Sequence, residues 1–319
     1  MAERLGSPEL VSLALDVAYI TEQRRDDVQA MVAGVERRVQ LADGIHAGID
    51  LDDIFYMAAQ AYWEQGRYRE ALAATEQGEA RVTAIGADAI GSESTSAITR
   101  MLMGDWDAVI DQYHVITARW DQPPGFLRMV YAVAESVFAM RGDREAAERI
   151  REVQFGTIGR LAFRARGLLA EGRIDEALAQ IPQSLHPDGI CFGMQVEAEL
   201  LRAAERWDDL AAHCRSVRER SQRIGWVLGP AVADRAEAAL AMVGGDAAAA
   251  EPLLQRSVAG FRAAGAEWDA AVSMLDLAAA LQALGRDGEA AAQLDAATPA
   301  LERAGGLVQL QQLALLRRG

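Results

Sequence analysis

Four histidines and two cysteines are the side chains in this sequence best suited to metal binding or nucleophilic chemistry. They are scattered along the chain: His46, His114, His186, His213, Cys191 and Cys214. His213 and Cys214 are neighbours, so on a helix their side chains would point about 100° apart. A zinc site would need closely spaced ligands such as a Cys-x-x-Cys pair, and the sequence contains none. We therefore predict ordinary surface or partly buried histidines, buried free thiols and no metal site.

Two common catalytic motifs are also missing from the sequence. No Gly-x-Ser-x-Gly elbow is present to expose a nucleophilic serine. A phosphate-binding loop of the Gly-x-x-x-x-Gly-Lys-[Ser/Thr] type requires lysine, and the chain contains no lysine at all. We therefore predict a protein that is not an enzyme, with no catalytic residues and no cofactor.

The overall composition restricts the partners and the compartment. The chain has 319 residues, 51% of them hydrophobic, and a formal net charge of -15. A field of this sign repels nucleic-acid phosphates and anionic lipids, so we expect no nucleic acid and no membrane as a partner. No apolar run approaches the roughly 18 residues of a membrane span, and the amino-terminal residues lack the pattern of a signal peptide. Two cysteines form no disulfide framework, which predicts a reducing, cytoplasmic location.

The densest basic segment of the chain covers residues 215–223. At helical spacing Arg215 and Arg218 share one side, and Arg220 and Arg223 share another. Because the charges are spread around the helix, we interpret this segment as a solvated helix surface. A site for an acidic partner is the alternative interpretation.

A repeated motif is the strongest signal in the sequence. The first clear copy starts at Gly66 and has a small residue, Ala71, five positions later. Further copies start at Gly104, Gly142, Gly172, Glu205, Gly245 and Gly285, and a degenerate copy starts at Gln23. Consecutive copies lie 30 to 43 residues apart, which is typical of a solenoid built from tandem structural units.

The residues of each copy predict a helix–turn–helix hairpin. Glycine ends the first helix because it adopts a left-handed conformation at little cost. The aspartate that often follows can cap the next helix, as we expect for Asp105, Asp143 and Asp246. At Gly244-Gly245 the register is ambiguous by one residue.

Prolines and glycines also mark breaks in the predicted helices. Loops between hairpins are predicted at residues 122–125, 182–189 and 229–230. Pro252 and Pro299 fall inside predicted second helices, where we expect each to kink or split its helix.

The hairpins resemble the tetratricopeptide repeat. With Gly66 on the turn glycine of that family, Phe55, Ala58, Ala59 and Tyr62 take the packing positions of the first helix, and Ala71 takes the alanine of the second. The chain departs from the pattern at Glu135 and Asp234, which put acids on packing positions. The resemblance covers nearly the whole chain.

The resemblance implies an all-α fold, a right-handed α-α superhelix of about eight helical hairpins in one domain, residues 1–319. Residues 1–45 would form a degenerate amino-terminal repeat. Residues 305–319 would form a carboxy-terminal capping helix, or alternatively a helix that pairs with another copy or another domain.

The resemblance also implies a concave groove lined by four positions of each first helix. These positions are Asp53, Tyr56, Gln60 and Trp63; Gly91, Ser94, Ile98 and Met101; Gly159, Ala162, Arg166 and Leu169; and Phe192, Gln195, Glu199 and Arg202. Aromatic residues and arginines supply most interface hot spots, which favours recognition of a protein or peptide segment. Alternatively, Trp63 and Phe192 only pack between repeats. The carboxylate clamp of the family needs lysine and asparagine, which this chain lacks, so that mode is not expected.

We therefore predict a non-enzymatic scaffold that binds a protein or peptide in its groove. A second function is left open, because residues 263–286 resemble repeats in the carboxy-terminal arrays of bacterial signalling ATPases, including cyclase-linked and LuxR-type or maltose-regulator-type transcription regulators. By that analogy the chain would be a regulatory domain that senses a small-molecule inducer. A sensor should have a closed apolar pocket with a few polar groups, and a scaffold should have an open groove.

Overall fold

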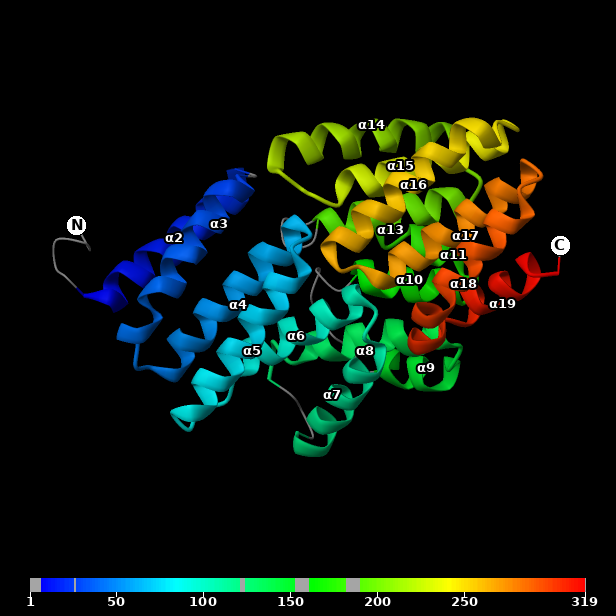
Figure 1. Cartoon of the computed structure of the whole chain (residues 1–319). Coiled ribbons are helices and arrows are strands. Elements are labelled where there is room, and N and C mark those ends of the chain that lie inside the picture. Colours follow the sequence, from blue (N-terminus) through cyan, green and yellow to red (C-terminus); the bar gives the residue numbers. More distant parts are fainter. Residues whose placement is uncertain (1–6, 26, 121–123, 153–160, 182–189, 319) are drawn as a thin grey trace.

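The computed structural model describes residues 7–25, 27–120, 124–152, 161–181 and 190–318 (Figure 1). His186, Gly159 and the predicted loop at 182–189 lie outside the described residues. Within these ranges the fold is all-helical and contains no strand. None of the described helices is long and apolar enough to cross a bilayer.

Seventeen α-helices and one short 3₁₀ helix make up the described chain. They are α2 (Pro8–Arg25), α3 (Val28–Leu41), η1 (Ala42–Gly44), α4 (Gly48–Gln65), α5 (Tyr68–Ala84), α6 (Ile90–Met103), α7 (Trp106–Arg119), α8 (Arg128–Arg141), α9 (Arg144–Glu152), α10 (Leu161–Ala170), α11 (Ile174–Leu178), α13 (Ile190–Ala203), α14 (Trp207–Ile224), α15 (Gly229–Val243), α16 (Ala247–Ala264), α17 (Glu267–Ala283), α18 (Asp287–Ala304) and α19 (Leu307–Leu316). Most helices pack mainly on helices one or two places away in sequence, as in a helical solenoid.

The turns inside the hairpins fall where the repeated motif predicts them. Six of the motif glycines have positive φ angles: Gly66, Gly104, Gly142, Gly172, Gly245 and Gly285. Glu205, which replaces glycine in its copy, also has a positive φ, of 55°, unlike every other non-glycine residue in the described chain. The φ of Gly244 is -72°, so Gly245 is the turn residue and the ambiguous register is resolved. The prediction at Gln23 is wrong, because α2 continues to Arg25 and α3 begins only at Val28.

The predicted caps and breaks are partly confirmed. Asp143 accepts a hydrogen bond from the Ala146 amide (3.0 Å), and Asp246 accepts one from Ala249 (2.9 Å). Asp105 does not cap α7; it pairs with Arg100 instead. Neither proline splits its helix, which leaves a kink as the part of the expectation that stays a prediction. Pro252 and Pro299 lie within the continuous helices α16 and α18, because each removes only one donor while the surrounding backbone bonds persist.

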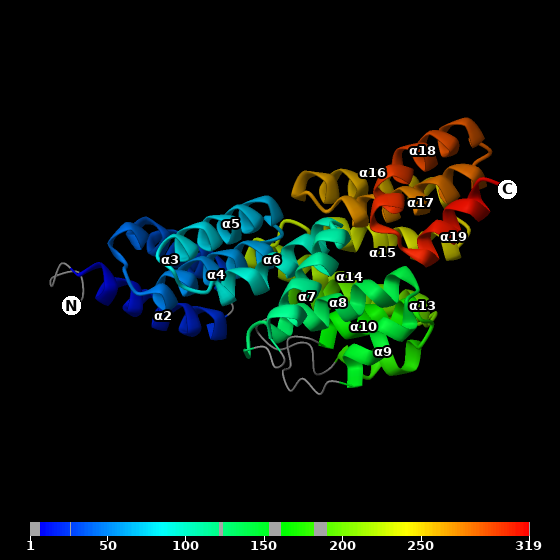
Figure 2. The ribbon, with the colours of Figure 1, turned by 90° about the horizontal axis from the view of Figure 1, so that it is seen from below.

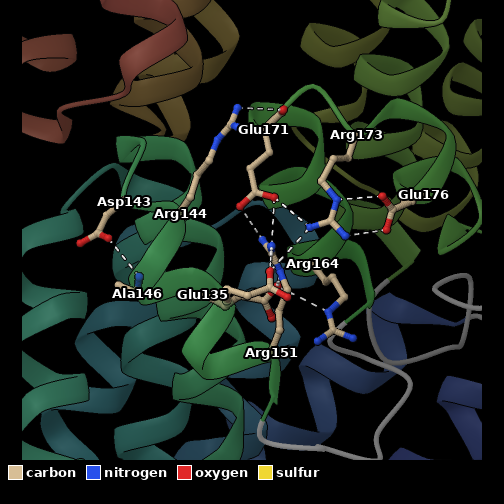
Figure 3. A network of polar contacts seen from close by, with 10 residues as sticks. Glu135, Asp143, Arg144, Ala146, Arg151, Arg164, Glu171, Arg173 and Glu176 are labelled. Atoms are coloured by element: carbon tan, nitrogen blue, oxygen red, sulfur yellow. Dashed lines mark hydrogen bonds and ion pairs between the residues drawn. The ribbon is translucent and has the colours of Figure 1, made fainter.

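The acid at the Glu135 packing position is neutralised by an arginine of the next helix (Figure 3). Arg151 of α9 donates to Glu135 (2.6 Å) and makes two bonds to Glu171 (2.8 and 2.9 Å). Both carboxylates are only 4% exposed. Burial alone would lower the pKa of Arg151, but its bonds to Glu171 and Glu135 raise it above the usual value. A charge at this position is therefore tolerated because it is paired.

Asp234 is buried and paired in the same way. It accepts hydrogen bonds from Arg218 of α14 (2.6 Å) and from Arg256 of α16 (2.9 and 3.0 Å). Arg218 also contacts Glu237. Within residues 215–223, Arg218 is thus ion-paired although its side chain is 36% exposed, and Arg215 is exposed as expected.

The carboxy-terminal helices fold back onto the middle of the chain (Figures 1 and 2). Helices α17, α18 and α19 contact α6, α7 and α8 respectively, and α13 contacts α4. The Trp106 and Trp268 rings lie 4.4 Å apart across this junction. We call these the closing contacts, because they bring together segments that an open solenoid would keep apart.

Two arginines strengthen the closing contacts by binding the ends of helices. Arg141 donates to the Ala304 carbonyl (2.7 Å) at the end of α18. Arg69 donates to the Ala263 carbonyl (3.2 Å) at the end of α16. The last carbonyls of a helix lack intrahelical partners and carry partial negative charge, so a guanidinium there is favourable.

The two ends of the chain differ in how they are covered. In the amino-terminal hairpin the polar side of α2 faces α3, where Ser12 and Asp16 bind the buried Arg38 (3.1 and 3.0 Å). The apolar side of α2 is exposed. At the other end, α19 packs on α17 and α18 and also reaches α8, so it contacts more of the chain than a simple capping helix.

Candidate functional site

A cavity of about 500 Å³ lies among helices of the middle and carboxy-terminal parts of the chain. Its walls come from helices separated by up to about half of the chain, from α8 to α19. The apolar part of the lining is Met140, Leu169, Ala170, Ile174, Ala198, Ala203, Trp207, Val232, Ala236, Phe261, Trp268, Val272 and Val308. The volume is within the range of about 300–1,000 Å³ typical of small-molecule sites.

One wall of the cavity carries a buried ionic cluster around Arg166 of α10. Arg166 makes two bonds to Glu199 of α13 (2.8 and 3.1 Å) and one to Asp269 of α17 (2.5 Å). Gln195 also donates to Asp269 (2.9 Å). Burial alone would lower the pKa of Arg166, but Asp269 and Glu199 raise it above the usual value. Arg166 therefore stays charged, and its ion pairs join helices α10, α13 and α17.

A second group of charges continues the same wall. Arg202 of α13 makes two hydrogen bonds to Asp276 of α17 (2.7 and 2.8 Å), and Arg235 of α15 makes one (2.9 Å). Arg235 also lies 3.8 Å from Glu199, which links the two groups. Burial alone would raise the pKa of Asp276, but the two guanidiniums hold it well below the usual value. Asp276 is therefore ionised at neutral pH.

A smaller lobe of about 200 Å³ adjoins the main cavity. Both are lined by Arg202, Trp207, Arg235, Asp276 and Gln312. The rest of the small lobe is apolar: Ala238, Ala239, Met242, Val243, Leu254 and Ala279. The Arg202–Asp276–Arg235 group thus lies between two apolar compartments, and we call it the waist.

The last helix completes the cavity wall. Val308, Gln309 and Gln312 of α19 line the main cavity. Within the described chain neither glutamine side chain makes a hydrogen bond to another residue. Two amide groups therefore remain available at the cavity for a bound molecule.

The predicted groove positions divide into two sets in the structure. Arg166, Gln195, Glu199 and Arg202 line the cavity together with Leu169. These residues come from the copies that begin at Gly172 and Glu205, and they line the same cavity; their role in a partner-binding groove stays a prediction.

The remaining predicted groove residues lie outside the cavity. Trp63, Gln60, Ser94, Met101 and Phe192 are buried among helices. Phe192 stacks on Phe163 with a centroid distance of 4.7 Å, so its burial agrees with the packing interpretation, as does that of Trp63. Ile98 and Ala162 are buried too.

The two groove residues nearest the start of α4 make contacts within the chain. Asp53 accepts a hydrogen bond from Arg38 (2.6 Å), and its side chain is 40% exposed. Tyr56 packs edge-on against Phe126, with a centroid distance of 5.2 Å, and also lies beside Gly91. Contact of any of these groove residues with a partner stays a prediction.

Several cavity residues were missed by the sequence analysis. Arg235 stands ten residues before Gly245, as Gln195 stands ten before Glu205, so the same offset applied to the later copies would have found it. Val232 and Val272 stand 13 residues before Gly245 and Gly285, as Phe192 stands 13 before Glu205, so that offset would have found them too. Asp269 and Asp276 carry no such signal, because they occupy other positions of the repeat.

The histidine and cysteine residues behave as structural side chains. His213 is buried and donates through Nε2 to the Met194 carbonyl (2.8 Å). Cys191 and Cys214 are buried free thiols, as predicted. Burial raises the pKa of the Cys214 thiol to about 11. Among the described residues, no group of three histidine, cysteine or acidic side chains is arranged to hold a metal ion.

Comparisons with known proteins do not assign the chain to a family. The chain matches no protein-family model and no curated protein.

Proposed function

We propose that this protein is a helical-repeat module that binds a small molecule in the half-open cavity, as a sensor or regulatory domain would. The observation that carries the proposal is the closure of α17–α19 onto α6–α8. This closure accompanies an apolar cavity with a few polar groups on one wall, which is the usual composition of a ligand site. The hairpins would belong to a right-handed superhelix of about eight tetratricopeptide-like repeats.

The alternative role, recognition of a protein or peptide along an open groove, has less support. An extended partner needs exposed side chains along several consecutive hairpins. Trp63, Met101 and Phe192 are each less than 10% exposed, so they would have to leave the core to reach a partner. A small molecule needs only entry to the existing cavity.

Cavity-filling variants provide the test. Ala198 lines the cavity and is nearly buried, so Ala198→Phe should occupy ligand space. A ligand at 100 times its Kd stabilises the folded state by about 2.7 kcal/mol, which is readily seen as a rise in Tm. We expect compounds from a small-molecule screen to raise the Tm of the parent protein and not that of Ala198→Phe.

The control is Ala292→Phe, which places the same ring at an exposed position of α18. It should respond to each compound as the parent does. If no compound stabilises the parent, or if Ala198→Phe responds equally, the cavity is not a ligand site.

A further inference from the structure

The waist holds more hydrogen-bond donors than acceptors. Asp276 accepts from three donor atoms, two on Arg202 and one on Arg235. Glu199 accepts two bonds from Arg166. The acceptors of the waist are therefore occupied, whereas Glu205, which also lines the main cavity, is exposed.

The donors of the same wall are only partly used. A guanidinium carries five N–H groups. Within the described chain Arg235 donates a single hydrogen bond, through Nε to Asp276, and its side chain is only 16% exposed. Arg202 uses its two terminal nitrogens on the same carboxylate and leaves Nε without a bond. A molecule that supplies acceptors at the waist would satisfy these groups.

The carboxylates are distributed unevenly along this wall. Two guanidiniums, those of Arg202 and Arg235, share the single carboxylate of Asp276. Arg166, farther along the wall, is instead enclosed by the two carboxylates of Glu199 and Asp269. The three arginines and three carboxylates of the linked wall balance in number, because Glu199 also lies 3.8 Å from Arg235. The preference for an anion therefore rests on the unused guanidinium donors at the waist and not on a net charge.

The surfaces on either side of the waist are apolar. Phe261, Trp268 and Val272 line the main cavity, and Met242 and Leu254 line the small lobe. A molecule seated at the waist would extend hydrocarbon into one lobe or both. Such a molecule gains both the charge-assisted hydrogen bonds and the burial of its apolar body.

We propose that the ligand of this cavity is an amphipathic carboxylate whose head binds Arg235 and Arg202 at the waist. This inference rests on the proposed small-molecule function and specifies its ligand class. Arg235 is the main determinant, because it is the more buried of the two and has the most unused donors. Gln312, which borders both lobes, lies where it can donate to the same head group.

The test uses three probes with the same ten-carbon chain: decanoate, 1-decanol and decylamine. Binding of each to the full chain is measured by isothermal titration calorimetry below its micelle concentration. We expect decanoate to bind about tenfold to a hundredfold more tightly than decanol, which is the range that charged hydrogen bonds supply. Decylamine should bind more weakly than decanol, because an ammonium group only donates hydrogen bonds and the waist has unused donors rather than unused acceptors.

Variants identify the recognising side chain. Arg235→Gln should reduce decanoate affinity to that of decanol and leave decanol binding unchanged, and Arg235→Lys should restore part of the difference. Arg256→Gln is the matched control, since Arg256 is 58% exposed and contacts Asp234 outside the cavity. Melting curves confirm that each variant is folded.

The outcomes separate the two proposals. Equal binding of decanoate and decanol, a preference for decylamine, or full decanoate affinity in both Arg235 variants would overturn the carboxylate proposal. The small-molecule function would then still stand, provided that Ala198→Phe abolishes the binding observed. If none of the three probes binds, the carboxylate proposal is overturned, and the small-molecule function is decided separately by the compound screen with Ala198→Phe.

Discussion

The position of the Trp268 ring can be tested by adding one methyl group to Gly306. Gly306 has an ordinary φ of -66°, so alanine causes no backbone strain there. A Cβ atom at this residue would, however, lie within 3.0 Å of three atoms of the Trp268 ring. Trp268 lines the cavity and contacts Trp106 in the closing contacts, so the ring cannot move without disturbing both. Overpacking of this kind costs about 1–3 kcal/mol.

Gly288→Ala is the matched control. Gly288 lies in α18, its φ is not in the left-handed region, and an added Cβ would meet nothing within 4 Å. Alanine is a better helix former than glycine, so this variant should be stabilised by up to about 1 kcal/mol. Both variants replace a glycine by an alanine, but they should shift the urea denaturation midpoint in opposite directions.

A double-mutant cycle identifies the cause of the Gly306→Ala effect. Trp268→Leu removes the ring atoms that the new methyl group would meet, so Gly306→Ala should cost nearly nothing in that background. The coupling between the two sites should then be about 1–3 kcal/mol. A parent-like midpoint for Gly306→Ala, or the same cost in both backgrounds, would refute the reasoning that Trp268 fills this space.

Two further predictions concern the buried charges. Arg151→Met should destabilise the protein by about 3–5 kcal/mol, because it removes the main partner of Glu135 and Glu171; in urea unfolding the exposed pair variant Arg149→Met should lose under about 1 kcal/mol, and equal losses would contradict the argument. The pKa of Asp276 is depressed in the folded state, so its contribution to stability is complete above its unfolded pKa of about 4 and is lost as the pH falls below it. The denaturation midpoint should therefore fall more steeply below about pH 4 in the parent than in Asp276→Asn, and parallel curves would count against this.

The hairpin turns could be predicted from the sequence because they depend on local chemistry. The left-handed conformation needed at a helix end is cheapest for glycine, so a recurring glycine reveals the turn in almost every copy. Even Glu205 was identified, because the residues after it follow the same pattern. The prediction failed at Gln23, where no glycine marks the turn and Asp27 caps α3 four residues later.

The cavity could be predicted only in part. Arg166, Gln195, Glu199 and Arg202 occupy positions that the repeat assigns to its inner face. Their partners Asp269 and Asp276 could not be assigned, because Arg166 and Asp269 are 103 residues apart in sequence. Their approach depends on the curvature that accumulates over several hairpins, and small differences in helix packing that set this curvature are not visible in a repeat pattern.

The contacts of Arg69 and Arg141 with later helices also constrain the order of events during synthesis. Arg69 and Arg141 bind carbonyls that lie 194 and 163 residues later in the chain. During synthesis on the ribosome, both guanidiniums must therefore stay exposed to solvent until the intervening hairpins have been translated and have packed on one another. Contacts of such long sequence separation form late. A chain that lacks α19 would have folded hairpins but an incomplete cavity wall, because Val308, Gln309 and Gln312 would be missing from it.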